Sequence, residues 1–234
     1  MTKEQIMHPK WGRVVVTRNP RARRIVMRAR PEAIHMTIPA NATTADIERA
    51  LDRHGDKLLC RQKENAPVPF DKEFSINAPN FRLRVEESRT ANIMVTGSDG
   101  TYILHCPVGT DYTMAGTQQA LRQCIKTAMK HCAGSVLPAR LKTLATEHGF
   151  KYNRCTVRDV HSRWGSCTST GNINLNMHLI ILPCRLIDYV LLHELCHTVE
   201  MNHSDRFWAL LDRCTAPDKA KTLRAKLKKE KFIV

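Results

Sequence analysis

The feature that constrains this chain most is a histidine-rich stretch near its C-terminal end. Residues 193–197 read H-E-x-x-H, and a further histidine, His203, follows six residues later. An α-helix turns about 100° per residue, so His193 and His197 lie about 40° apart on one face, one turn apart. That spacing lets two imidazoles bind one metal ion. Glu194 lies where it can take a proton from a metal-bound water.

The third histidine requires a turn in the chain. On an unbroken helix, His203 would lie roughly 9 Å beyond His197 and about 100° away from the ligand face. The chain must therefore turn between them, and Asn202 is the residue there that best tolerates a left-handed conformation. With that turn, three imidazole nitrogens and a water form an open tetrahedral site, which suits catalytic zinc. The alternative is a chance H-E-x-x-H on a core helix, with its histidines bonded to backbone groups.

The residues around the motif predict a buried helix that begins at Pro183. Apolar side chains cover nearly its whole circumference, so the histidines and the glutamate need partners, which a metal ion supplies. A further helix is predicted after the third histidine, with Ser204 as its cap and its apolar stripe packed under the metal site. That stripe comprises Phe207, Leu210, Leu211 and Cys214.

Composition restricts the class of protein. The 234 residues are 42% hydrophobic, which is typical of a globular chain with ample material for a core. No apolar run approaches the roughly 18 residues needed to span a membrane, and residues 1–7 lack the apolar segment of a signal peptide. The nine cysteines are odd in number and never spaced as C-x-x-C, which argues against a disulfide framework and a zinc knuckle. We therefore expect reduced thiols and a cytoplasmic location.

The charge balance is strongly basic. The formal net charge is +15, and Lys and Arg crowd residues 3–30 and 219–231. Such a balance brings a protein to nucleic acid or another polyanion, although no recognised nucleic-acid motif accompanies it. The alternative is a set of solvated basic faces without a partner. The sequence does not predict the oligomeric state.

Residues 1–112 predict a β-rich module with one helix. Apolar residues alternate through 11–39 in three short runs, which indicates three antiparallel strands joined by tight turns. A helix with a capping residue at its start is predicted from Thr43 to about Glu64. Alternation returns at 81–85, and residues 93–106 predict a hairpin around a Gly-Ser-Asp-Gly turn. The module contains no catalytic cluster.

Residues 113–234 predict a second domain of mixed structure. Helical spacing is present in 121–132 and 136–148, and Gly134 separates these two predicted helices. A strand is expected near 155–160. We find no internal repeat in the sequence.

A hairpin over residues 162–176 leads directly into the helix of the H-E-x-x-H motif. In its second strand Ile173 and Leu175 can point inward, while asparagines, Asn174 among them, line the other face. An edge strand beside the site could hold an extended peptide through backbone hydrogen bonds. An ordinary exposed hairpin is the alternative.

Two motifs together resemble a known family. They are the Ser-Arg-Trp-Gly-Ser-Cys hairpin beginning at residue 162, and H-E-L-C-H followed by Met-Asn-His-Ser and Phe-Trp. They resemble the YgjP-like metal-dependent hydrolases, which are related to SprT-type zinc metallopeptidases. The resemblance covers the whole chain in outline, and its specific part runs from about Thr156 to Leu211. It implies a zincin fold with zinc ligands His193, His197 and His203.

Taken together, the residues and the resemblance predict an α+β protein, with a β-rich N-terminal module and a zincin-like metallopeptidase domain carrying the H-E-x-x-H helix. We expect zinc-dependent hydrolysis of a peptide or protein substrate, with Glu194 as catalytic base. Candidates for the donor that stabilises the oxyanion are Arg163, Tyr189 and His178. Candidates for substrate binding are Arg163, Trp164, Asn174 and Tyr189.

One alternative of another class stays open. The chain could be a nucleic-acid-associated protein, either a protease recruited to DNA by its basic surfaces or a non-catalytic binder that the metal stabilises.

Overall fold

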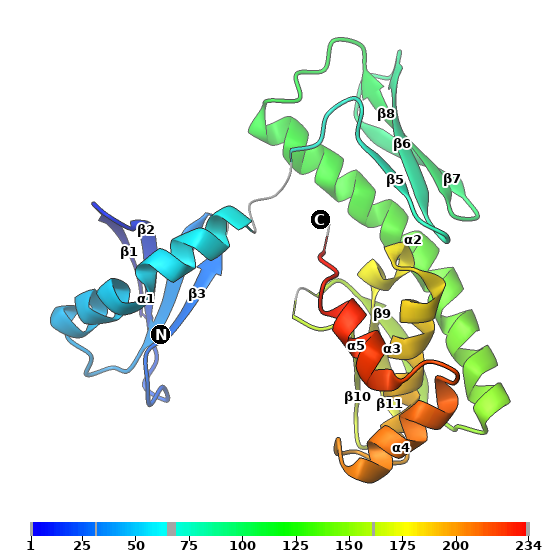
Figure 1. The fold of residues 1–234 in the computed structure, drawn as a ribbon. Coiled ribbons are helices and arrows are strands. Elements are labelled where there is room, and N and C mark those ends of the chain that lie inside the picture. The colour runs from blue at the N-terminus through cyan, green and yellow to red at the C-terminus, as the bar shows by residue number, and fades with distance from the viewer. Residues whose placement is uncertain (1, 31, 65–68, 161, 233–234) are drawn as a thin grey trace. The chain divides into compact units, whose positions relative to one another are not determined.

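The fold has mixed helices and strands, as expected. A computed structural model describes residues 2–30, 32–64, 69–160 and 162–232 (Figure 1). The chain forms two compact units, Met1–Val68 and Pro69–Val234. The predicted α+β class and the β-rich N-terminal region are both present.

The first unit is a four-stranded sheet followed by one helix. The sheet has the order β1-β2-β4-β3, in which β2 and β4 are parallel and the other pairs antiparallel. The elements are β1 (Thr2–His8), β2 (Gly12–Arg18), β3 (Val26–Arg30), β4 (Ala33–Ile38) and α1 (Thr44–Glu64).

The prediction of three antiparallel strands is therefore wrong in one pairing, and it missed β1. The chain leaves β2, forms β3 at the outer edge, and returns through β4 between the two, so β4 runs in the same direction as β2. Alternation reports which residues face the core, and it carries no information on which strands pair.

Helix α1 begins where the sequence predicted and packs on one face of this sheet. Thr43 Oγ1 accepts a hydrogen bond from the Asp46 amide (3.3 Å), and Asp46 Oδ2 accepts one from the Thr43 amide (2.8 Å). This reciprocal cap satisfies two amides that a helix start otherwise leaves unpaired. The helix covers a core centred on Trp11, Ile34 and Leu51.

The second unit begins with the same arrangement. Its first sheet has the order β5-β6-β8-β7, again with the two inner strands parallel and both outer pairs antiparallel, and again a helix follows. The elements are β5 (Ser75–Asn77), β6 (Arg82–Ser88), β7 (Met94–Ser98), β8 (Thr101–Pro107) and α2 (Ala115–His148). The chain thus repeats a topology although its sequence shows no repeat.

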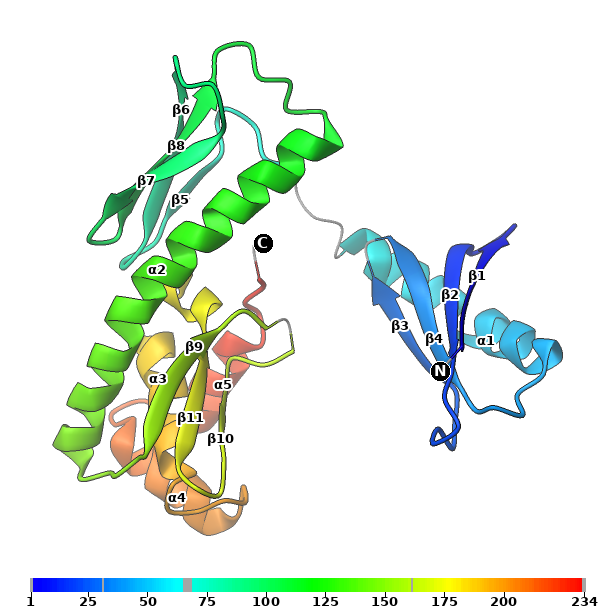
Figure 2. The ribbon, with the colours of Figure 1, turned by 180° about the vertical axis from the view of Figure 1, so that it is seen from behind.

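Helix α2 is a single helix of 34 residues, so the two helices predicted on either side of Gly134 are one. Pro138 also lies inside it, and its missing amide leaves one helical hydrogen bond unmade. A continuous buried face from Leu121 to Leu144 offsets that loss. In both views of the molecule α2 runs along the second unit, between its two sheets (Figures 1 and 2).

The rest of the second unit holds a three-stranded sheet and three α-helices. The sheet has the order β10-β11-β9, which makes β10 an edge strand. Its strands are β9 (Arg154–Arg158), β10 (Gly165–Cys167) and β11 (Asn172–Asn176). A 3₁₀ turn, η1 (Met177–Ile181), leads to α3 (Cys184–Cys196), α4 (Asp205–Cys214) and α5 (Ala220–Leu227).

The compact units divide the chain at a different place from the predicted boundary at residues 112 and 113. Strands β5–β8 pack on α2 through one continuous core that includes Phe81, Leu104 and Leu121, so they belong with the C-terminal part. As independently folding domains, 1–112 and 113–234 stay a prediction. No described helix is long and apolar enough to cross a membrane. No disulfide bond joins cysteines in the part of the chain that the structure describes.

Gly55 allows α1 to approach the sheet of the first unit. A Cβ atom added there would lie 2.7 Å from the indole of Trp11, which is fully buried. We expect Gly55→Ala to destabilise the first unit by about 1–2 kcal/mol, because overpacking outweighs the better helix propensity of alanine. Hydrogen exchange of the α1 amides measures this local stability.

Gly134→Ala in α2 is the matched control, since its added methyl group meets no atom within 4 Å. It should preserve or slightly raise protection in α2. Unchanged protection in α1 of Gly55→Ala would contradict the proposed close contact.

Candidate metal centre

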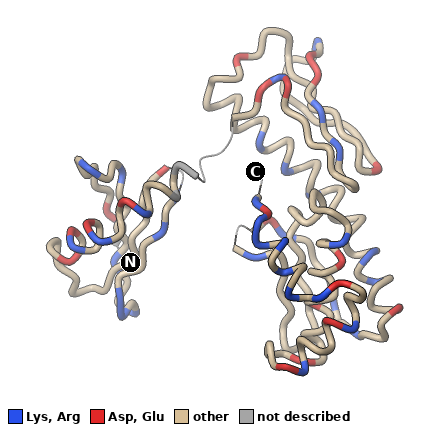
Figure 3. The backbone as a smooth tube through the Cα atoms, in the orientation of Figure 1, with Lys and Arg blue, Asp and Glu red and all other residues tan. Residues whose placement is uncertain are grey.

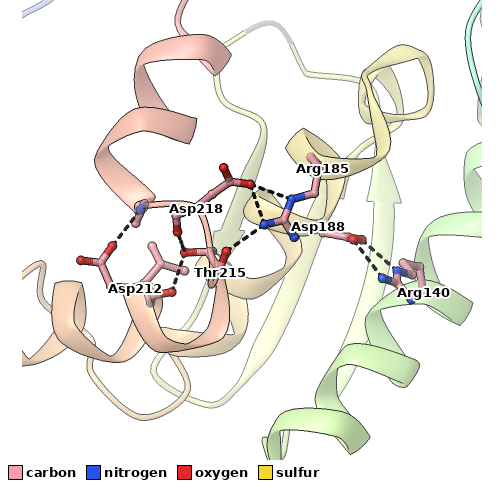
Figure 4. A network of polar contacts seen from close by, with 8 residues as sticks. Arg140, Arg185, Asp188, Asp212, Thr215 and Asp218 are labelled. Atoms are coloured by element: carbon pink, nitrogen blue, oxygen red, sulfur yellow. Dashed lines mark hydrogen bonds and ion pairs between the residues drawn. The ribbon is translucent and has the colours of Figure 1, made fainter.

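Helix α3 carries the H-E-x-x-H motif and is fixed at two points by ion pairs (Figure 4). On one side Arg140 of α2 binds Asp188 with two hydrogen bonds of 2.8 and 2.9 Å. On another side Arg185 binds Asp218 (2.6 and 2.9 Å) and the carbonyl of Thr215 (2.9 Å). The Arg140–Asp188 pair is bidentate, which fixes geometry as well as adding energy, whereas both Arg185 nitrogens donate to the same oxygen of Asp218. They hold α3 against α2 and against the corner between α4 and α5.

Three histidine rings meet at the C-terminal end of α3. Nε2 of His193 lies 3.2 Å from Nε2 of His197 and 3.1 Å from Nε2 of His203. One ring nitrogen from each of the three lies within 4.8 Å of the others. Nitrogen ligands of a tetrahedral zinc ion lie about 3.3 Å apart, since each zinc–nitrogen bond is about 2.05 Å long. The donor set therefore fits a divalent metal ion.

The turn that brings His203 back differs from the predicted one. Helix α3 ends at Cys196, and the chain continues through tight turns in which Thr198 N donates to Leu195 O (3.0 Å) and Glu200 N to Cys196 O (2.8 Å). Asn202 does not have a positive φ, so the predicted left-handed residue is wrong. The chain reverses through hydrogen-bonded turns in which no residue between His197 and His203 has a positive φ.

The ring of Phe207 packs against the imidazole rings of all three histidines. Its ring stacks on His197 at 4.5 Å and lies 4.9 Å from His193 and 4.7 Å from His203, measured between centroids. It is fully buried in the first turn of α4, whose cap is Ser204 as predicted (Phe207 N to Ser204 Oγ, 3.4 Å). Of the predicted stripe, Phe207 lies against the histidines, and Leu210, Leu211 and Cys214 belong to or pack against the core of this unit.

His193 and His203 favour the neutral form, which has a lone pair for a metal. Burial lowers the pKa of His193 to about 3, and the neighbouring His197 and His203 lower it further. Burial also lowers the pKa of His203. His197 Nδ1 lies 3.1 Å from the carbonyl of Glu200, to which it can donate, and that bond leaves the lone pair on Nε2.

Glu194 lies beside the cluster against the backbone of Gly165 in β10. A Cβ atom added at residue 165 would lie 2.6 Å from Glu194 Oε1, so only glycine leaves room for this carboxyl group. Burial raises the pKa of Glu194 to about 8, while the charge of Arg163 acts in the opposite direction. A nearby cation would also lower it, which keeps a proton-accepting form available near neutral pH.

A hollow of about 330 Å³ is lined by His193, His203 and Glu194. Of the residues predicted to bind substrate, Trp164 and Tyr189 line it. Arg163 and Asn174 do not: Arg163 is exposed, and the amide oxygen of Asn174 accepts from Thr156 Oγ1 at 2.6 Å. Gly165 also lines it, as do Arg224 and Leu227 of α5 and Lys228, the residue that follows this helix.

Sequence reasoning missed several of these residues. Gly165 lies inside the hairpin motif that was singled out, so its position was the available signal. Asn176 was noted only as part of an alternating strand, yet it is fully buried and donates to the carbonyls of Val160 (2.6 Å) and Arg163 (2.8 Å). It thereby binds both Val160 and Arg163, which precede β10. Arg224 had no signal beyond the basic tail.

His178, a candidate donor for the oxyanion, does not line the hollow. It is fully buried, with Nε2 3.4 Å from Asp159 Oδ1 and its ring 5.0 Å from that of Phe232. His178 therefore packs in the protein interior, and it does not face the hollow beside the histidine cluster.

Three converging imidazoles and a buried carboxyl group beside an open hollow are the kind of arrangement that metal-dependent hydrolases use. The chain belongs to the YgjP-like family: the YgjP-like metallopeptidase domain matches residues 23–230. It is therefore a metal-dependent peptidase by family.

Two solved structures are also similar to parts of the chain. The metallopeptidase zymogen abylysin of Pyrococcus abyssi is 21% identical, with a TM-score of 0.37 over 42% of this chain and 100% of that one. The metallopeptidase zymogen jannalysin of Methanocaldococcus jannaschii is 17% identical, with a TM-score of 0.35 over 40% of this chain and 94% of that one. The comparison with curated proteins returned no match.

The contact between Gly165 and Glu194 gives a first prediction for the site. We expect Gly165→Ala to displace the carboxyl group and to lower peptidase kcat by about 10²-fold, as a shift near 1 Å does elsewhere. Metal content, measured by elemental analysis, should not change, because the three histidines stay in place. Gly116→Ala, whose methyl group meets no atom within 4 Å, is the control. Full activity in the Gly165 variant would contradict this placement of Glu194.

Proposed function

We propose that the chain is a zinc-dependent peptidase that uses Glu194 as its general base and His193, His197 and His203 as zinc ligands. The observation that carries the proposal is the convergence of three Nε2 atoms, at 3.1 and 3.2 Å from the first, beside a carboxyl group only 5% exposed. Nitrogen ligands in a tetrahedral set favour zinc over the oxygen-preferring calcium and magnesium.

When bound, a zinc ion would supply a Lewis acid that polarises the scissile carbonyl and lowers the pKa of water. Glu194 takes the proton of the attacking water and passes it to the leaving amine. Gly165 leaves the carboxyl group room, and burial keeps its pKa high enough for it to accept a proton. Phe207 contacts all three imidazoles and thereby restricts their movement.

The substrate is proposed to lie along β10. This strand pairs with β11 on one side only in the described part of the chain, so its other edge can bond to an extended peptide. Trp164 and Gly165 line the hollow from this strand and the residue before it, which would bring a bound peptide past Glu194.

Glu194 also argues against the non-catalytic alternative. It is buried yet forms no ion pair with any described residue. A metal site that only stabilised the fold would need three histidines and a fourth ligand, not a buried carboxyl group left beside them. Cytoplasmic location, expected from the free thiols, stays a prediction.

A single substitution tests the mechanism. Glu194→Gln preserves size but removes the proton acceptor, so we expect kcat to fall by about 10²–10⁴-fold while zinc stays bound. Hydrolysis of unfolded protein substrates and metal content by elemental analysis are the two measurements.

His203→Ala is the complementary variant. Losing one of three ligands should remove most of the zinc as well as the activity. An active Glu194→Gln enzyme would refute the mechanism, and full zinc content in His203→Ala would remove that residue from the ligand set.

Tyr189 is the proposed donor to the oxyanion. It lines the hollow, its ring lies 6.0 Å from that of His193, and burial raises its pKa to about 12, so the hydroxyl keeps its proton. We expect Tyr189→Phe to lower kcat by about 10²–10³-fold with little change in KM. The phenyl ring retains the packing. An unchanged kcat would shift this role to Arg224, which Arg224→Gln then tests.

A further inference from the structure

A second and larger hollow lies in the first unit, entirely apart from the catalytic residues. Its volume is about 860 Å³, and its walls are the end of the loop before β3, strand β3, and helix α1. Four arginines, a lysine and a histidine line it, against one carboxylate: Arg23, Arg24, Arg49, Arg53, His54, Lys57 and Asp46.

Most of these cations lack an internal counterion. Asp46 is already bound by Arg49 at 2.6 Å and serves the cap of α1. Among the described residues, Arg24, Arg53 and Lys57 take part in no ion pair. Placing like charges around one hollow raises the free energy of the protein alone, and a dense anion would relieve that repulsion.

Comparison with the second unit, which has the same topology, shows that a hollow between the helix and the outer strand is not required by the fold. In the second unit the equivalent helix α2 packs on the equivalent strand β7, close enough for Cys124 Sγ to donate to the carbonyl of Ile93 at 3.8 Å. Ile93, Val95 and Cys124 extend the core there. In the first unit the apolar residues Met27 and Leu58 also line the space between helix and strand, but four arginines and a lysine line it as well. Packing alone does not require these cationic residues.

We propose that this hollow binds the phosphate backbone of a nucleic acid. Arg49, Arg53 and Lys57 follow one another at intervals of four residues, so they form a row on one face of α1 at about 6 Å spacing. That spacing is on the order of the distance between successive backbone phosphates. Guanidinium groups match phosphate oxygens two at a time.

The residues of the hollow also indicate how the nucleic acid is bound. No Phe, Trp or Tyr lines it, and the imidazole of His54 is the one aromatic ring among its described lining residues. Binding should therefore depend mainly on charge, with little preference for base sequence. In Figure 3, Lys and Arg recur on both α1 and the sheet of this unit, which extends the positive field beyond the hollow.

A matched pair of double variants tests the proposal on the full-length protein. Arg53→Gln with Lys57→Gln removes two charges from the hollow, and both side chains are exposed. Arg28→Gln with Arg30→Gln removes two charges from β3, whose exposed arginines alternate with the half-buried Met27 and Ala29 that face α1. Both variants remove two positive charges from the first unit, the first pair from the hollow on α1 and the second from residues of β3 that do not line the hollow.

Fluorescence anisotropy of labelled oligonucleotides, single-stranded in one arm and duplex in the other, gives the affinities at about 50 and 200 mM salt. For the hollow variant we expect affinity to fall roughly 20-fold at about 200 mM salt, and the salt slope to fall by about 2. The β3 variant should keep the slope of the native protein. A loss in either arm supports the proposal, and the arm with the larger loss identifies the form bound.

Three results would overturn it. Equal losses in both variants would mean that net charge, and not the hollow, governs binding. Absence of binding at about 50 mM salt would remove the site altogether. Displacement of the oligonucleotide by polyglutamate of equal total charge, at equal concentration, would assign the hollow to acidic polypeptides. Peptidase activity should be unchanged in both variants, so this test does not depend on the catalytic proposal.

Discussion

The second unit is organised by the need to bring three imidazoles together at the end of a buried helix. Two of them come from one helical face, but the third requires the chain to reverse within the residues between His197 and His203. Phe207 then fills the space beneath all three rings. The imidazoles converge only if helix α3 keeps its position. The ion pairs Arg140–Asp188 and Arg185–Asp218 fix it to α2 and to the α4–α5 corner. The turn after α3, the packing of Phe207 and the two ion pairs therefore all help to bring the three imidazoles together.

The sequence predicted the parts of this arrangement that depend on local spacing. His193 and His197 follow from helical periodicity, Ser204 from capping chemistry, and Phe207 from its apolar stripe. The hairpin before α3 and the capped start of α1 were predicted for the same reason. Each of these signals lies within a few residues of the feature that it specifies.

Features that depend on contacts between distant segments could not be predicted in this way. The parallel pairing of β2 with β4 depends on where the chain places β3. Gly134 and Pro138 suggest a break in α2, yet the continuous buried face from Leu121 to Leu144 outweighs them. Arg224 reaches the hollow only because α5 folds back onto α3. Gly165 is required by Glu194, which lies far from it in sequence and against it in space.

The two units share a topology that is not evident from their sequences. Both sheets have the same strand order and directions, and each is followed by a helix that packs near its outer strand. In the second unit that helix is long, its contact with β7 is apolar, and its far end supports α3 and β9. In the first unit the helix is shorter and packs on a single sheet. Between this helix and β3 lies the hollow lined by Arg and Lys side chains. The same frame can therefore serve as a scaffold for a metal site or as a cationic surface, since the side chains between helix and outer strand decide which.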